Sequence, residues 1–535
     1  MAKKKPVKKA KKNNLLFTTG DWTLDTIQKV YNEIDKIAKE ELKLDIFPMQ
    51  IEIISSDQML DAYSAHGLPI FYHHWSLGKR HLYDERNYEK GHSALAYEII
   101  INTNPTIAYL MENNTMTMQT LVLSHVMGHA HFFKNNYLYK QWTQPEFIVD
   151  YLKFAKNYIN ECEQKYGLSA VEQVLDAAHA LQYNSVDRYK RKTRTKKDIK
   201  KQLEARAKYE EETYNDLWKI INQKKSEGIK ASEQDKLKEQ FKQRILPAPE
   251  ENLLYFLEKN SPVLQPWQRE ILRIVRKIGV YFYPQMQDKI MNEGFACFCH
   301  YYIMNRLFEK GMISEGNMIE FLSSHTNVVF QSAPDFRDER QKVKDRRRGK
   351  AEPYPYSGLN PYALGFAMMQ DIKRICENPT DEDKKWFPDI AGKNWKDIII
   401  DEIIPNYRDE SFIRQYLSPK IIRDFRLFAL RNDEEEPNYY SVLDIHNERG
   451  YRNVRKILAE MNDINSKIPN IQIVDVDMLE TRKLVLHHFS TNNQVLSGNP
   501  IEILQYIKQL WGYDIVLESL DADGDTMEIY DTSKL

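Results

Sequence analysis

The stretch SHVMGHAHFFKNN, residues 124–136, predicts the helix around which the fold is built. It places His125, His129 and His131 in an apolar run, and the pattern predicts a helix over residues 115–134. Two histidines four positions apart share one face of a helix, so both ring nitrogens can reach a single metal ion. His125 and His129 therefore predict a metal site.

The residues between and beside these histidines limit what such a site can do. In the protease form of the pair a glutamate follows the first histidine and accepts a proton, whereas here that position is Val126. Gly128 lies between the pair, and a glycine inside a helix costs roughly 1 kcal/mol relative to alanine. We therefore expect another backbone or a ligand to approach Gly128 closely. His131 lies on a different face and is a candidate acid or base.

A third ligand is expected from the segment KIMNEGFACFCHYYIMNRL, residues 289–307. Glu293 is the acid in the first half of this apolar helix, and a buried carboxylate is very costly unless it is paired, protonated or bound to metal. Zinc enzymes of the thermolysin type take two histidines from one helix and a glutamate from elsewhere in the chain. The sequence therefore predicts that His125, His129 and Glu293 bind a divalent metal, with zinc as the expected ion.

Alternatives to this prediction stay open. Glu293 could form a buried salt bridge with Arg306 or Arg188, and the histidine pair could be hydrogen-bonded core residues. His300 falls on the same helical stripe as Glu293 and is a candidate acid or base, because an imidazole with a pKa of about 6.5 suits proton transfer at neutral pH. Asn292 could orient a ligand histidine through its second ring nitrogen.

The composition and charge of the chain exclude several classes of protein. The chain has 535 residues and a net charge of −1, so there is no overall basic field that would attract nucleic acid. No run of 18 apolar residues and no secretory signal are present, which predicts a cytoplasmic protein without a membrane span. The four cysteines form no disulfide framework, and reduced thiols are expected.

The periodicity along the chain predicts an α+β protein that is predominantly α-helical, and the layout of the expected metal ligands predicts that its helical core is zincin-like. Towards the carboxyl end the pattern changes to helix, two strands, helix and strand, which predicts a small α+β domain. The expected division is a disordered lysine-rich tail (1–15), a mainly helical domain carrying the metal site (16–432, with a charged helical excursion at 190–245) and the small α+β domain (433–535).

A family resemblance covers most of the chain. The segments that carry it are PIFYHHWSLGKR, YEIIINTNPTIAYLMENNT, SHVMGHAHFFKNNYL, LDAAHALQYNSVDRYKR, PEENLLYFLEKNSP, WQREILRIVRKIGVYFYPQMQDKIMNEGFACFCHY, FLSSHTNVV and NPYALGFAMMQDIKRICENPTDEDKKWFPDIAG. With these segments the sequence resembles the SpoVR (stage V sporulation protein R) family. In that family the histidines of GH and H-x-x-x-H and the NEG triplet recur, and they fall here on His125, Gly128 and His129 and on residues 292–294. The CFC segment at residues 297–299 and the preceding Phe295 depart from the usual pattern.

The resemblance implies a role in spore cortex formation or in stress responses, in association with an AAA+ serine kinase of the PrkA type. The cortex is modified peptidoglycan, so the resemblance implies a link to the cell wall but fixes no reaction. With the predicted metal site, the expected activity is metal-dependent hydrolysis of an amide in a peptide or peptidoglycan precursor. The alternative is a non-catalytic, metal-stabilised adaptor for the kinase.

Overall fold

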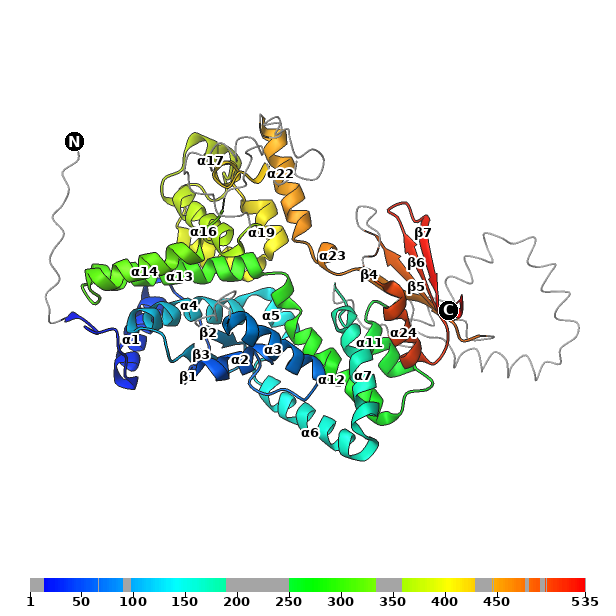
Figure 1. Cartoon of the computed structure of the whole chain (residues 1–535). Helices are drawn as coiled ribbons and strands as arrows, with labels where there is room; N and C mark the ends of the chain where they lie inside the picture. Colours follow the sequence, from blue (N-terminus) through cyan, green and yellow to red (C-terminus); the bar gives the residue numbers. More distant parts are fainter. Residues whose placement is uncertain are drawn as a thin grey trace, which may run out of the picture. The chain divides into compact units, whose positions relative to one another are not determined.

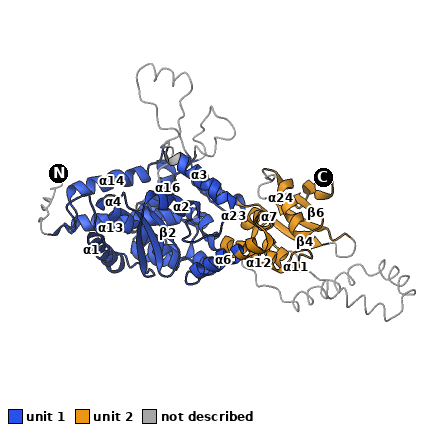
Figure 2. Cartoon of the chain, turned by 60° about the horizontal axis from the view of Figure 1, so that its bottom comes forward, with its two compact units in different colours: residues 1–160, 281–467 blue, residues 161–280, 468–535 orange. Residues whose placement is uncertain are grey.

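The computed structural model describes residues 14–65, 67–89, 98–188, 250–332, 358–428, 445, 447–476, 481–490, 496 and 498–534. The protein is predominantly helical and forms two compact units (Figure 2), residues 1–160 with 281–467 and residues 161–280 with 468–535. Residues 1–13 of the lysine-rich tail and the excursion at 190–245 lie outside the described residues. Among the described helices, none is long and apolar enough to cross a membrane.

Unit 1 contains a three-stranded sheet and most of the helices (Figure 1). Its elements are α1 (Leu24–Lys36), η2 (Ile37–Glu41), β1 (Met49–Ile54), α2 (Ser56–Ser64), α3 (Trp75–Glu89), β2 (Glu98–Ile101), β3 (Thr106–Met111), α4 (Met116–Asn135), α5 (Tyr137–Trp142), η4 (Pro284–Met286), α13 (Lys289–Glu309), α14 (Glu315–Val328), α16 (Pro361–Glu377), α17 (Asp381–Trp386), η5 (Asp397–Ile403), α18 (Ile404–Asn406), α19 (Asp409–Tyr416), α20 (Pro419–Asp424), α22 (Glu448–Met461) and α23 (Ile464–Lys467). The helix α6 (Ile148–Tyr166) leads from unit 1 into unit 2, and α12 (Pro266–Phe282) leads back.

The sheet of unit 1 has the strand order β1-β3-β2. β1 runs parallel to β3, and β2 runs antiparallel to it, which leaves β2 at one edge of the sheet. The central strand β3 alternates buried and half-buried residues, as expected for a strand that packs one face on a core. α4 contacts both β2 and β3, so the edge strand and the predicted metal helix are neighbours.

α4 is the central helix of unit 1. The Thr115 side chain accepts a hydrogen bond from the backbone N–H of Met118 and caps the helix, and every residue from Met116 to Phe133 is buried. A helix that is buried on all sides needs partners around its whole circumference. The sheet and α1 supply part of this cover, and α13 packs along α4 (Figure 1).

Close contacts of α13 depend on glycines. A Cβ atom added to Gly128 of α4 would lie 2.7 Å from the Cα of Ala296 on α13, so the two backbones touch where the sequence led us to expect a close approach. On its other side, α13 brings Gly294 against Gly365 of α16, where an added Cβ would lie 2.4 Å from the Gly365 Cα. Any side chain at these positions would force the helices apart.

The amino-terminal end of α13 is held by α19. The buried carboxylate of Asp409, the first residue of α19, accepts hydrogen bonds from the backbone N–H groups of Ile290 at 3.1 Å and Met291 at 2.9 Å. These N–H groups have no partner within their own helix, and a carboxylate also interacts favourably with the helix dipole there. Asp409 thus fixes the turn that carries Asn292 and Glu293.

Unit 2 contains a second sheet with helices. Its elements are α7 (Leu168–Ala180), η3 (Gln182–Asn184), α11 (Leu253–Asn260), β4 (Asn470–Val476), β5 (Leu484–Phe489), α24 (Pro500–Trp511), β6 (Ile515–Leu520), β7 (Thr526–Asp531) and η7 (Thr532–Lys534). The strand order is β4-β5-β6-β7, with β5 parallel to β6 and the other pairs antiparallel. A buried ion pair between Arg188 and Glu251, with 3.1 Å between Nε and Oε1, lies in the same unit.

Candidate metal centre

The structure brings the three predicted ligands together. His125 and His129 project from α4, and Glu293 projects from α13, so that their ligand atoms all lie within 4.8 Å of one another. The two Nε2 atoms are 3.0 Å apart, and Oε2 of Glu293 lies 3.4 Å from Nε2 of His129 and 3.8 Å from Nε2 of His125. The close helix contact at Gly128 makes this convergence possible, because it draws α13 onto the face of α4 that carries the histidines.

These separations suit a tetrahedral ion. Zinc bound by histidine and carboxylate at about 2.0–2.1 Å places neighbouring tetrahedral ligands about 3.3 Å apart. The observed separations of 3.0, 3.4 and 3.8 Å bracket that value. Two imidazoles and one carboxylate are also the donor set of a zinc site of the thermolysin type. The residues present therefore fit a divalent metal such as zinc.

Neither arginine considered as a competing partner reaches Glu293. Nε of Arg306 lies 2.6 Å from the Glu41 carboxylate, and Arg306 also pairs with Glu309. Arg188 pairs with Glu251 in unit 2. The salt-bridge alternative for Glu293 is therefore wrong for both arginines, and Glu293 instead contacts the two imidazoles and the side chain of Tyr362.

The site favours positive charge. Burial alone would raise the pKa of Glu293, but the attraction of His129 and hydrogen bonds from His125 and His129 hold that pKa well below its ordinary value. Burial would likewise lower the pKa of His129, but the Glu293 carboxylate and a hydrogen bond with Asn292 raise it. Either a proton or a metal ion can supply the positive charge that balances the Glu293 carboxylate.

Asn292 orients one ligand. Its Oδ1 lies 2.9 Å from Nδ1 of His129, and an amide oxygen can only accept a hydrogen bond. His129 is therefore protonated at Nδ1, which leaves Nε2, the nitrogen nearest Glu293 and His125, to hold either a second proton or a metal ion. Partners of this kind on the second ring nitrogen are typical of metal-binding histidines, and the sequence had suggested this role for Asn292.

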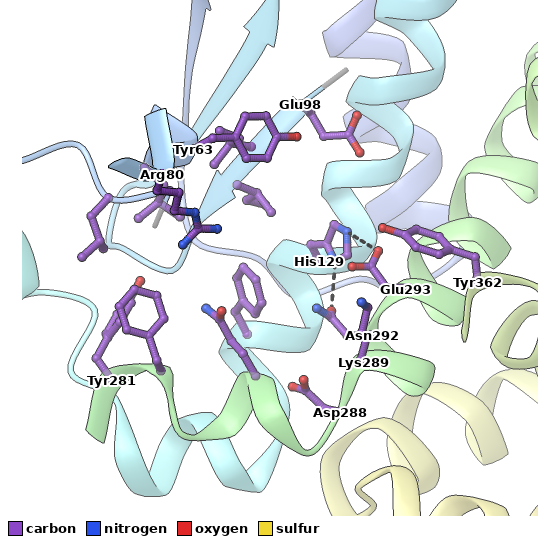
Figure 3. Close-up of a pocket in the computed structure, with 18 residues that line it drawn as sticks. Tyr63, Arg80, Glu98, His129, Tyr281, Asp288, Lys289, Asn292, Glu293 and Tyr362 are labelled. Atoms are coloured by element: carbon purple, nitrogen blue, oxygen red, sulfur yellow. Dashed lines mark hydrogen bonds and ion pairs between the residues drawn. The ribbon is translucent and has the colours of Figure 1, made fainter. Parts of the chain in front are cut away.

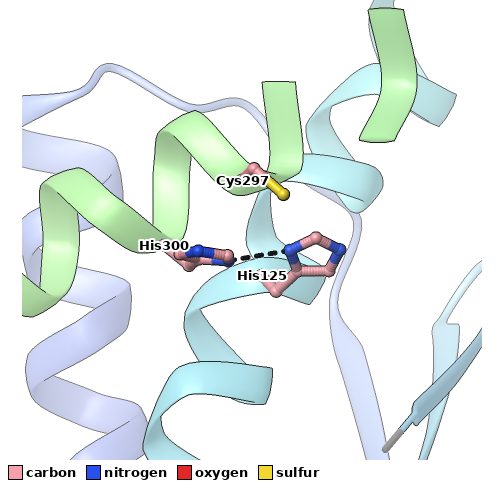
Figure 4. A group of neighbouring side chains, drawn as sticks. All are labelled: His125, Cys297 and His300. Atoms are coloured by element: carbon pink, nitrogen blue, oxygen red, sulfur yellow. Dashed lines mark hydrogen bonds between the residues drawn. The ribbon is translucent and has the colours of Figure 1, made fainter. Parts of the chain in front are cut away.

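Behind His125 the hydrogen bonds continue through two further histidines (Figure 4). Nδ1 of His300 lies 2.9 Å from Nδ1 of His125, the contact drawn in Figure 4. Nε2 of His300 in turn lies 2.7 Å from Nδ1 of His325, which Figure 4 does not draw. Burial, together with the neighbouring His125 and His325, lowers the pKa of His300 well below its ordinary value, so the ring is neutral. His300 is in place to hold the ring of His125, and it does not line the cavity described below.

Cys297 lies beside His125 and His300, and these three residues form a second group whose ligand atoms lie within 4.8 Å of one another (Figure 4). Here, however, the two imidazoles are joined directly through their Nδ1 atoms. Burial raises the pKa of the Cys297 thiol well above its ordinary value, so the sulfur keeps its proton at neutral pH. The first group, with its carboxylate, is the better metal site. All four cysteines are buried, and none of them forms a disulfide bond.

A cavity of about 500 Å³ opens at the three predicted ligands, His125, His129 and Glu293, which we call the metal group (Figure 3). It is lined by Tyr63, Gly67, Leu68, Arg80, Glu98, Ile99, Ile100, Ile101, His129, Phe133, Tyr281, Phe282, Gln285, Asp288, Lys289, Asn292, Glu293 and Tyr362. The four residues of the edge strand β2 form part of this wall, and two of the three predicted ligands, His129 and Glu293, face the same space. Tyr362, near the start of α16, lies next to Glu293 in this view.

Glu98 is a second carboxylate at the metal group. Its Oε1 lies 3.7 Å from Nε2 of His125. Burial raises the pKa of Glu98, the neighbouring histidines His125 and His129 oppose this shift, and the charge of Glu293 adds to it. Glu98 could be noticed in the sequence only as a lone acid in the apolar strand ALAYEIIIN. Nothing in the sequence pointed to Tyr362, which follows a proline at a helix start far along the chain.

The structure does not bring His131 to this site. Its Nδ1 accepts a hydrogen bond from the backbone N–H of Asp45 at 2.9 Å, and its ring packs against Phe295. Burial lowers the pKa of His131 to about 4. Val126 is fully buried in the apolar core and does not line the cavity, so a glutamate at that position would lie in the core and not over the metal group.

Comparison with known proteins identifies the family of the chain. Residues 21–467 match the family described as SpoVR like protein, and residues 469–522 match the SpoVR-like C-terminal domain. The chain is 48% identical over 506 residues to the uncharacterized protein YcgB of Escherichia coli (strain K12), a match that covers 94% of each chain. No solved structure matches. The chain therefore belongs to the SpoVR family.

Proposed function

We propose that this protein binds a divalent metal, zinc in the first instance, through His125, His129 and Glu293, and uses it to hydrolyse an amide bond. The observation that carries the proposal is the convergence of these three ligand atoms at the edge of a cavity. An ion held there would supply a polarised carbonyl and an activated water at neutral pH. This is the sense in which the core is zincin-like.

An open position on the ion is expected from the ligand count. Structural zinc normally has four protein ligands, whereas catalytic zinc has three and keeps one position for water or substrate. Among the described residues, the group that includes Glu293 offers three ligand atoms. Because His129 and Glu293 also line the cavity, a fourth position directed into that space would be accessible to a substrate.

The walls of the cavity favour a peptide-like substrate. Arg80 and Lys289 bring cationic side chains to the wall, and both can bind a carboxylate. Tyr63 and Tyr281 add aromatic surface with polar tips. Peptides and the peptide stems of peptidoglycan precursors combine amide bonds with free carboxylates, and a precursor as substrate would agree with action in the cytoplasm during cortex formation or a stress response.

A second function is favoured by one observation, the absence of a glutamate after His125. With Val126 in the core, the protein could hold a metal only to join α4 to α13, and serve as a non-catalytic adaptor for an AAA+ kinase of the PrkA type. In that case removal of the metal would lower stability, and no amide would be hydrolysed.

The metal content of the full-length protein tests the proposal. Purified protein is reconstituted with zinc, freed of excess ion and measured by elemental analysis. We expect one equivalent in the wild type, a loss of that equivalent in His129→Ala, and full retention in His131→Gln, a control on the same buried helix. Turnover is then measured with peptide mixtures and peptidoglycan stem peptides. A wild type that holds no metal refutes the site, and metal without turnover favours the adaptor.

A further inference from the structure

Glu98 reaches the metal group from a different element than the ligands do. It is the first residue of β2, the edge strand of the sheet, while the ligands project from α4 and α13. In Figure 3 its carboxylate lies on the wall of the cavity, on the sheet side of His129 and Glu293. About 19% of the Glu98 side chain is exposed, and Glu98 is one of the residues that line the cavity.

Glu98 lies beside the three proposed ligands and is not one of them. Its Oε1 lies 3.7 Å from Nε2 of His125, the nitrogen that faces the metal position. It does not belong to the set of atoms that are all within 4.8 Å of one another, which consists of His125, His129 and Glu293. A group at this place can contact what the ion binds without taking up one of the ion's own coordination positions.

We propose that Glu98 is the proton acceptor for the water that attacks the amide. Glu98 would thus act from the sheet in the role that the glutamate after the first histidine has in the protease pattern. This inference rests on the proposed function. The water oxygen forms a bond to the carbonyl carbon as one of its O–H bonds breaks, and the proton moves to the Glu98 carboxylate. The C–N bond then breaks, and the same proton passes to the leaving nitrogen, so the carboxylate is restored.

The other candidates for this role are less well placed. His300 contacts His125 through Nδ1, on the side of the ring away from the metal position, and does not line the cavity. His131 is bound to the backbone of Asp45. Among the described residues, Glu98 and Glu293 are the carboxylates that form ion-pair contacts with the ligand imidazoles, and Glu293 is the better ligand because it contacts both.

A small metal-binding acid tests this role without knowledge of the substrate. Acetohydroxamate gives up a proton when it chelates a metal ion, and a neighbouring carboxylate can accept that proton. Cobalt-substituted protein is titrated with acetohydroxamate, and binding is followed by the visible absorption of the ion. We expect Glu98→Gln to keep one equivalent of cobalt but to bind acetohydroxamate about tenfold or more weakly, since a charge-assisted hydrogen bond is replaced by a neutral one.

Two further variants separate the roles. Glu52→Gln changes a half-buried carboxylate on β1 of the same sheet and should leave acetohydroxamate affinity at the wild-type value, while Glu98→Asp should recover part of it. If Glu98→Gln loses the cobalt, Glu98 is a ligand and the inference is wrong. If it keeps both the cobalt and the wild-type affinity, the inference is also wrong. A wild type that binds no cobalt would instead overturn the proposed metal site itself.

Discussion

The glycine contacts of α13 predict a graded loss of stability on substitution by alanine. A Cβ atom on Gly294 would lie 2.3 Å from the carbonyl carbon of Gly365, and the neighbouring helix must recede by 1.1 Å to restore a contact of 3.4 Å. On Gly128 the Cβ would lie 2.7 Å from the Cα of Ala296, which requires 0.7 Å. On Gly316 of α14, by contrast, the nearest atom is 3.7 Å away.

These distances set the expected magnitudes. Overpacking of a core costs about 1–3 kcal/mol, while alanine gains about 1 kcal/mol over glycine inside a helix. Because the atoms in the way belong to the backbone, we expect the upper end of the cost at Gly294, and hence a net loss of about 2 kcal/mol. Gly128→Ala should lose about 1 kcal/mol, and Gly316→Ala should be neutral or slightly stabilising.

Hydrogen–deuterium exchange measured by mass spectrometry tests this order locally. A loss of 2 kcal/mol corresponds to about 30-fold faster exchange in peptides from α13 and α16, provided that exchange follows the opening equilibrium. Gly316→Ala should leave these peptides unchanged. If Gly294→Ala exchanges at the wild-type rate, α13 and α16 can separate without cost, and the account of how glycines hold these two helices together is refuted.

Two further predictions concern hydrogen bonds of single side chains. Burial would raise the pKa of Asp383, but hydrogen bonds from Arg374 and Thr380 lower it to about 2. The ionised Asp383 should therefore add about 2 kcal/mol to the free energy of unfolding above pH 4, and this contribution should be lost as pH falls towards 2. Urea unfolding of Asp383→Asn against wild type at pH 7 and pH 3 measures this, and a difference that grows on acidification would contradict it. His300→Leu removes the partner of His125 Nδ1 and should lower zinc affinity 10- to 100-fold in a chelator competition. His300→Asn keeps a hydrogen-bond acceptor and should lower zinc affinity less. Equal losses of affinity in the two variants would argue against this partnership.

Local patterns predicted much of the fold. The helix expected over residues 115–134 is observed as α4, Met116–Asn135. This prediction succeeded because both of its signals, the capping residue Thr115 and the long apolar run, lie within one segment. The predominantly helical class and the small carboxyl-terminal sheet are also confirmed. The strand β7, with the sequence TMEIYD, was not predicted, since it has little apolar alternation and depends on pairing with β6.

The site was predictable only where it follows from the geometry of one helix. The spacing of His125 and His129 fixes a shared face, and the cost of a buried acid singles out Glu293. A helical wheel does not show what packs on each face, so the neighbours of His131 could not be foreseen. Glu98 reaches the site through the pairing of β2 with β3 and the packing of α4 on that sheet, and these long-range contacts leave no local signal.

The order of the segments along the chain has a consequence for synthesis. Glu293 follows His129 by 164 positions, and residues 161–280 of unit 2 are made in between. At about 5–20 residues per second the ribosome needs roughly 10–30 s to deliver the third ligand after the second. During this interval the apolar surface of α4 has no α13 to cover it. The newly made chain exposes that surface for this time, and the three proposed ligands are all present only when translation is more than half complete.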